Sequence, residues 1–297
     1  MRGLIHVSVM NRRNEMKKKN KIQVIFSTIN NNIQLKVGLI LLAILLFVAI
    51  FGPYLAPYNP KTLNDDLFAA PCAKYPLGTD NLGHDILSQI LCGASTSLKI
   101  GIIAAVISAV IGVTFGGIAG FYGGIADRIL NEIMNIFLML PTFFLILLII
   151  ATFGSSMTNV MIVIGLTSWV GNARLMRAQA KAIRERTFVK SCIAMGESKA
   201  SILIKHVLPN GIFPIIANTT MNISSAILTE AGLSFLGLGD PNVVSWGQII
   251  NTGKGYLPKC WWICTFPGIA TIFTVLTFFL IGEGLNRVLS PKMDANK

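Results

Sequence analysis

The stretch IGIIAAVISAVIGVTFGGIAGFYGGIA, residues 100–126, decides the class of fold because it contains no charged residue between Lys99 and Asp127. About 20 apolar residues span the hydrocarbon core of a bilayer, and a charge at the centre of such a span is costly. The composition of the chain agrees, since 53% of its 297 residues are hydrophobic and 13% are charged, against about 25% charged residues in soluble domains. The sequence therefore predicts a membrane protein.

Uncharged runs of similar length recur along the chain and predict further spans. The run between Glu132 and Arg174 is too long for one helix and is interrupted near Gly154, so it is interpreted as two spans joined by a turn. The expected fold is an all-α membrane protein with six transmembrane helices. They are placed at 37–57, 98–121, 131–153, 159–178, 207–230 and 262–285.

The net charge of +12 is distributed unevenly along the chain. All but five of the 25 Lys and Arg fall in the N-terminal tail, in the loops after the second and fourth predicted spans, and at the C-terminus. Loops rich in Lys and Arg stay cytoplasmic, so both termini are predicted on the cytoplasmic side. The predicted organisation starts with a basic tail over 1–36, an anchor helix over 37–57 and an outer segment over 58–97. A helical core over 98–290 follows, and it contains a cytoplasmic loop at about 178–206 and an outer segment at 231–261. The last predicted segment is a tail over 291–297.

The first predicted span is expected to persist as an anchor in the membrane. Its apolar run is longer than the about 7–15 residues of a signal-peptide core, and no small-x-small cleavage pattern follows it. Met1, Met10 and Met16 are alternative initiation residues, and the choice among them leaves the six predicted spans unchanged.

The sequence carries no motif of the common enzyme classes. It has no G-x-S-x-G, no H-E-x-x-H and no paired-carboxylate motif, and the string around Lys254 lacks the Ser or Thr of a nucleotide-binding loop. The five cysteines and three histidines are scattered without metal-ligand spacing. We therefore expect no catalytic residue, no metal site and no cofactor in this chain. Cys72 and Cys260 both fall in outer segments, where either a disulfide or two free thiols would fit.

Polar residues recur on one face of the fifth predicted span. They are Asn218, Asn222, Ser225 and Thr229, at steps of four, three and four. Polar groups in a membrane helix either line a pathway or form hydrogen bonds to neighbouring helices, and the spacing alone is compatible with both. Glu230 ends the stripe and is expected either to face an outer vestibule or to lie at the membrane interface.

A second pattern, in the second predicted span, consists of glycines at every fourth position. They are Gly112, Gly116, Gly120 and Gly124. Missing side chains along one face let another helix approach closely, so this ridge predicts helix packing and no chemistry.

The long basic segment RLMRAQAKAIRERTFVKSCIAMGESKASILIKHVLPN, residues 174–210, has the pattern of a helix, a turn and a second helix. Strong helix formers lie on both sides of Gly196, where a residue without Cβ permits a tight turn. Such a segment either presents one face to a cytosolic partner or is a solvated loop that only sets the orientation of the chain.

From about residue 37 to 292 the chain resembles the permease subunits of binding-protein-dependent ABC importers of the dipeptide, oligopeptide and nickel type. The basic segment is similar to the EAA motif of that family, except that Lys190 stands where the family has Glu. Further strings that resemble the family are LGTDNLGHDILSQIL at 77–91, GLTSWVGNARLMR at 165–177 and EAGLSFLGLGDPNVVSWGQII at 230–250. The resemblance assigns ATPase coupling to Lys190, Ser191, Cys192, Gly196, Glu197, His206, Leu208 and Pro209.

The resemblance implies the type I ABC importer architecture and alternating access in a prokaryotic cytoplasmic membrane. The implied partners are a second homologous permease, two ATPase subunits that hold ATP and Mg, an extracytoplasmic solute-binding protein and the lipid bilayer, with no nucleic acid. Peptides are the expected substrate, and nickel, a metal chelate or an opine is the alternative. A six-span channel or secondary transporter is more remote, because no charged residue lies at the centre of a predicted span.

Overall fold

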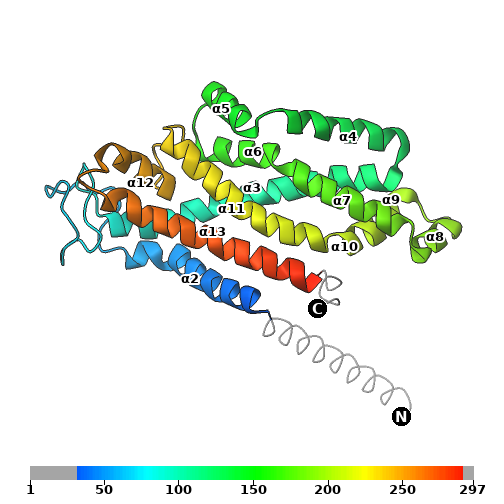
Figure 1. Ribbon diagram of the computed structural model, residues 1–297, viewed down its shortest axis with the longest axis horizontal. Helices are drawn as coiled ribbons and strands as arrows, with labels where there is room; N and C mark the ends of the chain where they lie inside the picture. The colour runs from blue at the N-terminus through cyan, green and yellow to red at the C-terminus, as the bar shows by residue number, and fades with distance from the viewer. Residues whose placement is uncertain (1–31, 290–297) are drawn as a thin grey trace, which may run out of the picture.

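The computed structural model describes residues 32–289, and within them the chain forms an elongated bundle of helices (Figure 1). The outer segments gather at one end of the bundle. The start of α2, the end of α13 and the short helix α8 lie toward the opposite end. This arrangement agrees with the prediction that the first span begins and the last span ends on the same side. Most of the tail predicted over 1–36, the tail over 291–297 and the three candidate initiation residues lie outside the described residues.

The central helix is α3, Ile86–Tyr122, which contacts four other long helices. They are α2 (Ile33–Leu55), α7 (Trp169–Arg184), α11 (Phe213–Phe235) and α13 (Trp262–Leu289). The shorter α6 (Met157–Thr167) also packs on α3. Because α3 touches elements from both halves of the chain, it organises the core (Figure 1).

The helix α3 begins earlier than the predicted span at 98–121. Asp85 is its N-cap, and the Asp85 carboxylate accepts a hydrogen bond from the Ser88 backbone N–H at 2.8 Å. A capping side chain satisfies a donor that the first turn of a helix leaves free. Residues 86–97 of the predicted outer segment are therefore already helical. Charge and apolar pattern mark the membrane-embedded part of a helix and not its polar extension.

The third predicted span, 131–153, is wrong as a single helix. The chain forms α4 (Gly124–Met139) and α5 (Thr142–Phe153), which meet at an angle of 84°. Pro141 lies at the break and forces the preceding residue out of the helical region. Leu140 accordingly has φ −83° and ψ 129°, an extended conformation.

The remaining short elements complete the loops at the two ends of the bundle. At the cytoplasmic end they are α8 (Thr187–Ala194), α9 (Lys199–Ile202), the π-helix η1 (Leu203–Val207) and α10 (Leu208–Gly211). At the outer end they are α12 (Trp246–Gly253) and the 3₁₀-helix η2 (Lys254–Tyr256). The α9–α10 segment meets α11 at an angle of 61°, next to Pro214 in the first turn of α11.

Among the described helices, three are long and apolar enough to cross a membrane: α2, α3 and α13. The number reaches five if each of the two bent pairs forms one span. The six predicted spans exceed this number because the predicted span at 159–178 is divided at Ser168 between α6 and α7. On this criterion α6 is too short, with 11 residues, and the basic α7 is not apolar.

The glycine ridge of α3 lies against α7 at three of its four positions. A Cβ on Gly112 would lie 2.5 Å from the Cβ of Asn172, and a Cβ on Gly116 would collide with the backbone carbonyl of Ala173. Gly120 meets α7 in the same way. The packing expectation is wrong for Gly124, which begins α4 with φ +56° and has open space around it.

We expect Gly116→Ala to destabilise the chain, because the added Cβ forces apart two backbones that touch. Overpacking of this kind costs about 1–3 kcal/mol. Thermal unfolding in detergent should show a lower midpoint than the wild type. Gly268→Ala in α13 is the matched control, since open space surrounds Gly268 and Ala favours a helix by about 1 kcal/mol. Equal midpoints for the two variants would contradict the assigned packing.

Candidate functional site

The cytoplasmic loop, residues 185–211 in the structure, follows α7 and begins with α8. Gly196 ends α8 with φ +82°, a conformation that favours glycine. Its N–H donates to the Ile193 carbonyl at 3.0 Å, and the Glu197 N–H donates to the Cys192 carbonyl at 3.1 Å. These two bonds form a Schellman motif. The turn expected at Gly196 is therefore a helix stop that reverses the chain.

The helix α8 buries one side and exposes the other. Val189 is fully buried in an apolar cluster with Ile202 and side chains of α3, α7 and α11. Ile193 and Met195 are 47% and 77% exposed, and Phe188 is also exposed. Exposed apolar side chains on an anchored helix are typical of a surface that binds a partner.

Three of the predicted coupling residues lie on the surface of the loop. Lys190 is exposed, and its Nζ lies 3.1 Å from a carboxylate oxygen of Glu185. The Ser191 hydroxyl donates to the Thr187 carbonyl at 3.0 Å. Pro209 is exposed in the first turn of α10. The ammonium of Lys190, which stands where the family has Glu, is therefore paired with Glu185 inside the loop.

Leu208 anchors the loop on α3. Its side chain is half-buried against the apolar cluster below α8, and its Cδ2 lies 2.7 Å from where a Cβ on Gly117 would be. The neighbouring Val207 is fully buried. The end of the loop is thus held by packing on the central helix.

Glu197 and His206 form a polar group at the Gly196 turn. The Ser201 hydroxyl donates to Glu197 Oε1 at 2.7 Å, and His206 Nε2 lies 3.2 Å from Glu197 Oε2. The Ser201 bond, followed by the nearby His206, lowers the pKa of the Glu197 carboxyl. Partial burial and then the charge of Glu197 raise the pKa of the Cys192 thiol.

Together Cys192, Glu197 and His206 place their ligating atoms within 4.8 Å of one another. The expectation that each histidine stands apart from other metal-ligating side chains is therefore wrong for His206. The signal was missed because the three residues have no regular spacing, and a turn and a π-helix bring them together.

The polar stripe of α11 divides between two environments. Asn218 points into the bundle, where its Nδ2 donates to Oδ1 of the buried Asn172 in α7 at 2.9 Å. Ser225 is exposed, and Thr229 is half-buried with its hydroxyl bonded to the Ser225 carbonyl at 2.8 Å. Asn222 is half-buried between these two ends. Asn218 thus serves helix packing, and the exposed part of the stripe stays a candidate pore lining.

Glu230 is buried inside the subunit, whereas a side chain that faced an outer vestibule would be exposed. It is 4% exposed and accepts hydrogen bonds from the hydroxyls of Ser234 and Ser245, each at 2.8 Å. Ser245 also caps α12. Buried polar groups need hydrogen-bond partners, and here the partnership joins α11 to α12 at the outer end.

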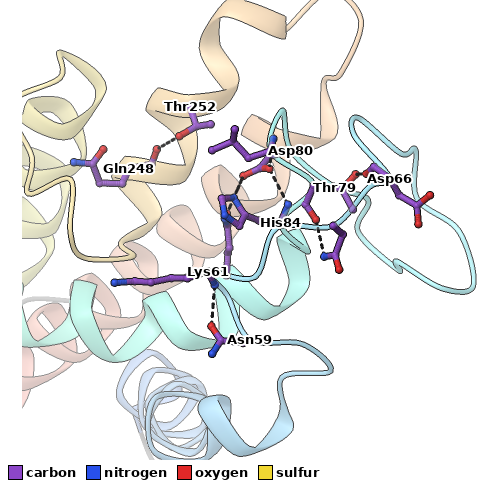
Figure 2. A network of polar contacts seen from close by, with 12 residues as sticks. Asn59, Lys61, Asp66, Thr79, Asp80, His84, Gln248 and Thr252 are labelled. Atoms are coloured by element: carbon purple, nitrogen blue, oxygen red, sulfur yellow. Dashed lines mark hydrogen bonds and ion pairs between the residues drawn. The ribbon is translucent and has the colours of Figure 1, made fainter.

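The outer face is organised around the buried carboxylate of Asp80 (Figure 2). Asp80 Oδ1 accepts from the Leu82 and His84 backbone N–H groups, each at 2.9 Å, and Oδ2 contacts His84 Nδ1 at 2.8 Å. Gln89 Nε2 donates to the same Oδ2 at 3.2 Å. These bonds close the turn that leads into α3.

A cavity of about 450 Å³ opens beside Asp80, between the two outer segments. His84 and Gln89 line it from one segment, and Gln248 and Thr252 line it from α12. Lys61 bridges the segments, because its Nζ donates to the Asn242 carbonyl at 2.8 Å. Figure 2 shows Lys61, His84, Gln248 and Thr252 in one region of the outer face.

Two partnerships could not be predicted from the sequence because the partners are distant in the chain. Asn172 is fully buried and bonds both Asn218 and the Ser108 hydroxyl. In the sequence, Asn172 stands out only as a polar amide inside the span predicted at 159–178. Asp127 pairs with Lys181 of α7 at 2.8 Å, and Arg177 donates to it at 2.9 Å.

The cysteines of the outer segments are free thiols in the structure. Cys72 is exposed and Cys260 is buried. Of the two arrangements that the sequence allowed, the structure therefore has the one without a disulfide.

Family models match most of the chain. The model described as "binding-protein-dependent transport system inner membrane component" matches residues 112–295. A second model, "N-terminal TM domain of oligopeptide transport permease C", matches residues 36–71.

Curated relatives are similar over nearly the whole length. The chain is 40% identical over 265 residues to the dipeptide transport system permease protein DppC of Escherichia coli (strain K12), covering 86% of this chain and 88% of that protein. It is 36% identical over 264 residues to the di/tripeptide transport system permease protein DppC of Pseudomonas aeruginosa (strain UCBPP-PA14), covering 86% and 87%. It is 37% identical over 253 residues to the glutathione transport system permease protein GsiD of Shigella flexneri serotype 5b (strain 8401), covering 84% of each.

A solved structure shares the fold. It is an inward-facing form of the MetNI methionine ABC transporter, similar at a TM-score of 0.51 and 20% identity over 67% of this chain and 95% of that chain. The helical bundle, the family models and the relatives thus define a multi-pass permease subunit of a binding-protein-dependent importer. The chain belongs to the family of inner membrane components of binding-protein-dependent transport systems.

Replacing Asp80 should loosen the outer face. Asp80→Ala leaves the part-buried Leu82 and His84 N–H groups without their acceptor. An unsatisfied donor that is fully shielded from water costs about 1–3 kcal/mol, which is the upper limit for each of these two. We expect a lower unfolding midpoint and faster proteolysis of the outer segment. The matched control is Asp65→Ala, since Asp65 is exposed in the same segment. If Asp80→Ala were as stable and as protease-resistant as Asp65→Ala, the organising role of Asp80 would be refuted.

Proposed function

We propose that this chain forms, with a second homologous permease, the membrane pore of an ATP-driven importer of short peptides. An extracytoplasmic binding protein delivers the peptide to the outer face. Two cytosolic ATPase subunits, which hold ATP and Mg, dock on the cytoplasmic loop and drive alternating access. This chain hydrolyses nothing itself.

The anchored cytoplasmic loop is the observation that carries this proposal. Its exposed side offers Ile193 and Met195 to a partner, and its buried side packs Val189 against the bundle. When a docked partner displaces a helix held in this way, the movement is transmitted to α3, α7 and α11, because packed interiors transmit strain.

The choice of peptides is supported by the relatives. Those with 36–40% identity are named for dipeptides, di/tripeptides and glutathione, which is itself a tripeptide. The 450 Å³ cavity on the outer face has the size of small-molecule sites, about 300–1,000 Å³. We assign this face to reception of the loaded binding protein.

Met195→Asp tests the docking side of the loop. Met195 is 77% exposed, so the variant should fold and insert normally, but a charge in an apolar contact should weaken ATPase binding by at least about tenfold, or 1.4 kcal/mol. Affinity in mild detergent and peptide uptake in proteoliposomes are the measurements. Leu63→Asp is the control, because Leu63 is 67% exposed in the outer segment. Unchanged ATPase affinity for Met195→Asp would remove the loop from the docking surface.

The substrate is tested on the cognate solute-binding protein. We expect di- and tripeptides to bind it in calorimetry with dissociation constants on the order of micromolar or tighter, that is, about −8 kcal/mol or more favourable. Nickel salts and nickel chelates are titrated in parallel. Saturable binding of a nickel species without peptide binding would overturn the peptide assignment and favour a metal importer.

A further inference from the structure

Three side chains with different metal-ligating atoms converge in the cytoplasmic loop. They are the thiol of Cys192, the carboxylate of Glu197 and the imidazole of His206, whose ligating atoms all lie within 4.8 Å of one another. Within this group, His206 Nε2 and Glu197 Oε2 are separated by 3.2 Å. Neither the family match nor the proposed transport function calls for a metal site at these three residues.

The backbone brings these residues together from three elements. Cys192 lies in the last turn of α8, Glu197 directly follows the Gly196 turn, and His206 lies in η1. The Schellman motif places Glu197 back over Cys192, with 3.1 Å between the Glu197 nitrogen and the Cys192 carbonyl oxygen. The π-helix is an unusual element that often occurs at functional sites, and it supplies the imidazole.

The geometry resembles a zinc site that needs only slight closure. Zinc binds nitrogen and oxygen ligands at about 2.1 Å in a tetrahedron, which puts two such ligands about 3.4 Å apart. The 3.2 Å between His206 Nε2 and Glu197 Oε2 is close to that separation. A thiolate ligand at about 2.3 Å from zinc would lie about 3.6 Å from either atom. Since the Cys192 sulfur already lies within 4.8 Å of the other ligating atoms, its side chain would move inward by at most about 1 Å.

The surroundings orient the carboxylate and leave the group accessible. Ser201 holds Oε1 of Glu197 at 2.7 Å, which directs Oε2 toward His206. Hydrogen bonds of this kind fix ligating carboxylates in metal sites. The side chains of His206 and Glu197 are 35% and 27% exposed, so an ion can enter from the cytosol. Cys192 is partly buried against the apolar cluster.

We propose that Cys192, Glu197 and His206 form a binding site for a zinc-class divalent cation. A thiolate, an imidazole and a carboxylate are ligands that zinc accepts, and a water or a partner's side chain completes the fourth position. Binding releases the thiol proton to the solvent and joins the end of α8 to η1. The ion thereby stiffens the loop. The proposal needs only this chain and stands whether or not the loop docks on an ATPase.

The test uses the full chain in lipid nanodiscs, freed of metal and titrated with Zn²⁺ in calorimetry. We expect one ion per chain. Titration with Co²⁺ should produce a near-ultraviolet thiolate-to-metal absorption band, which reports the sulfur ligand directly. Cys192→Ser should abolish this band and weaken Zn²⁺ binding by at least about tenfold, since loss of even an outer partner of a ligand costs about 10–100-fold.

Matched variants separate the site from adventitious binding. Cys72→Ser removes an exposed thiol from the outer segment and should leave the band and the affinity unchanged. Glu197→Gln and His206→Gln should each weaken Zn²⁺ binding, and the unfolding midpoint of the metal-free variants reports whether each one folds. Absence of saturable Zn²⁺ binding to the wild type, or equal binding by wild type and a folded Cys192→Ser, would overturn the proposal and leave a hydrogen-bonded Glu–His contact.

Discussion

The close contact between α3 and α7 is the constraint on which most of the structure depends. Helices in a bilayer gain no hydrophobic free energy by meeting one another, so close backbone approach and interhelical hydrogen bonds hold them together. Glycines of α3 permit the approach, and Asn172 is fully buried beside them. Its amide donates to Ser108 of α3 and accepts from Asn218 of α11. One side chain therefore joins three helices.

The same contact positions the cytoplasmic loop, because α7 runs directly into it. Ile202 is fully buried in a cluster that includes side chains of α3, α7 and α11, and Leu208 packs at its edge. Near this end, Asp127 binds Arg177 and Lys181 and ties α4 to α7. The loop is thus fastened to the base of the bundle while its apolar outer side stays exposed, which suits an element that receives force from a partner.

The outer face is fastened by hydrogen bonds between segments distant in sequence. The indole N–H groups of Trp246 and Trp262 donate to the carbonyls of Ile90 and Thr79, at 3.0 and 3.1 Å. The first bond holds α12 to the start of α3, and the second holds the start of α13 to the outer segment that precedes α3. Because α3 has 37 residues, it is about 55 Å long at 1.5 Å per residue. A single helix therefore connects the outer face with the cytoplasmic end of the bundle.

The all-α membrane class and the turn at Gly196 could be predicted from the sequence, because uncharged runs and glycine report local costs of burial and backbone strain. Basic loops predict the sidedness in the same local way. The bend of 84° inside the span predicted at 131–153 could not be predicted. The burial of Glu230 and the contact of Asn218 with Asn172 follow only from the packing of the helices. Helical spacing shows which residues share a face, but the partner of that face is chosen by packing among helices far apart in the chain.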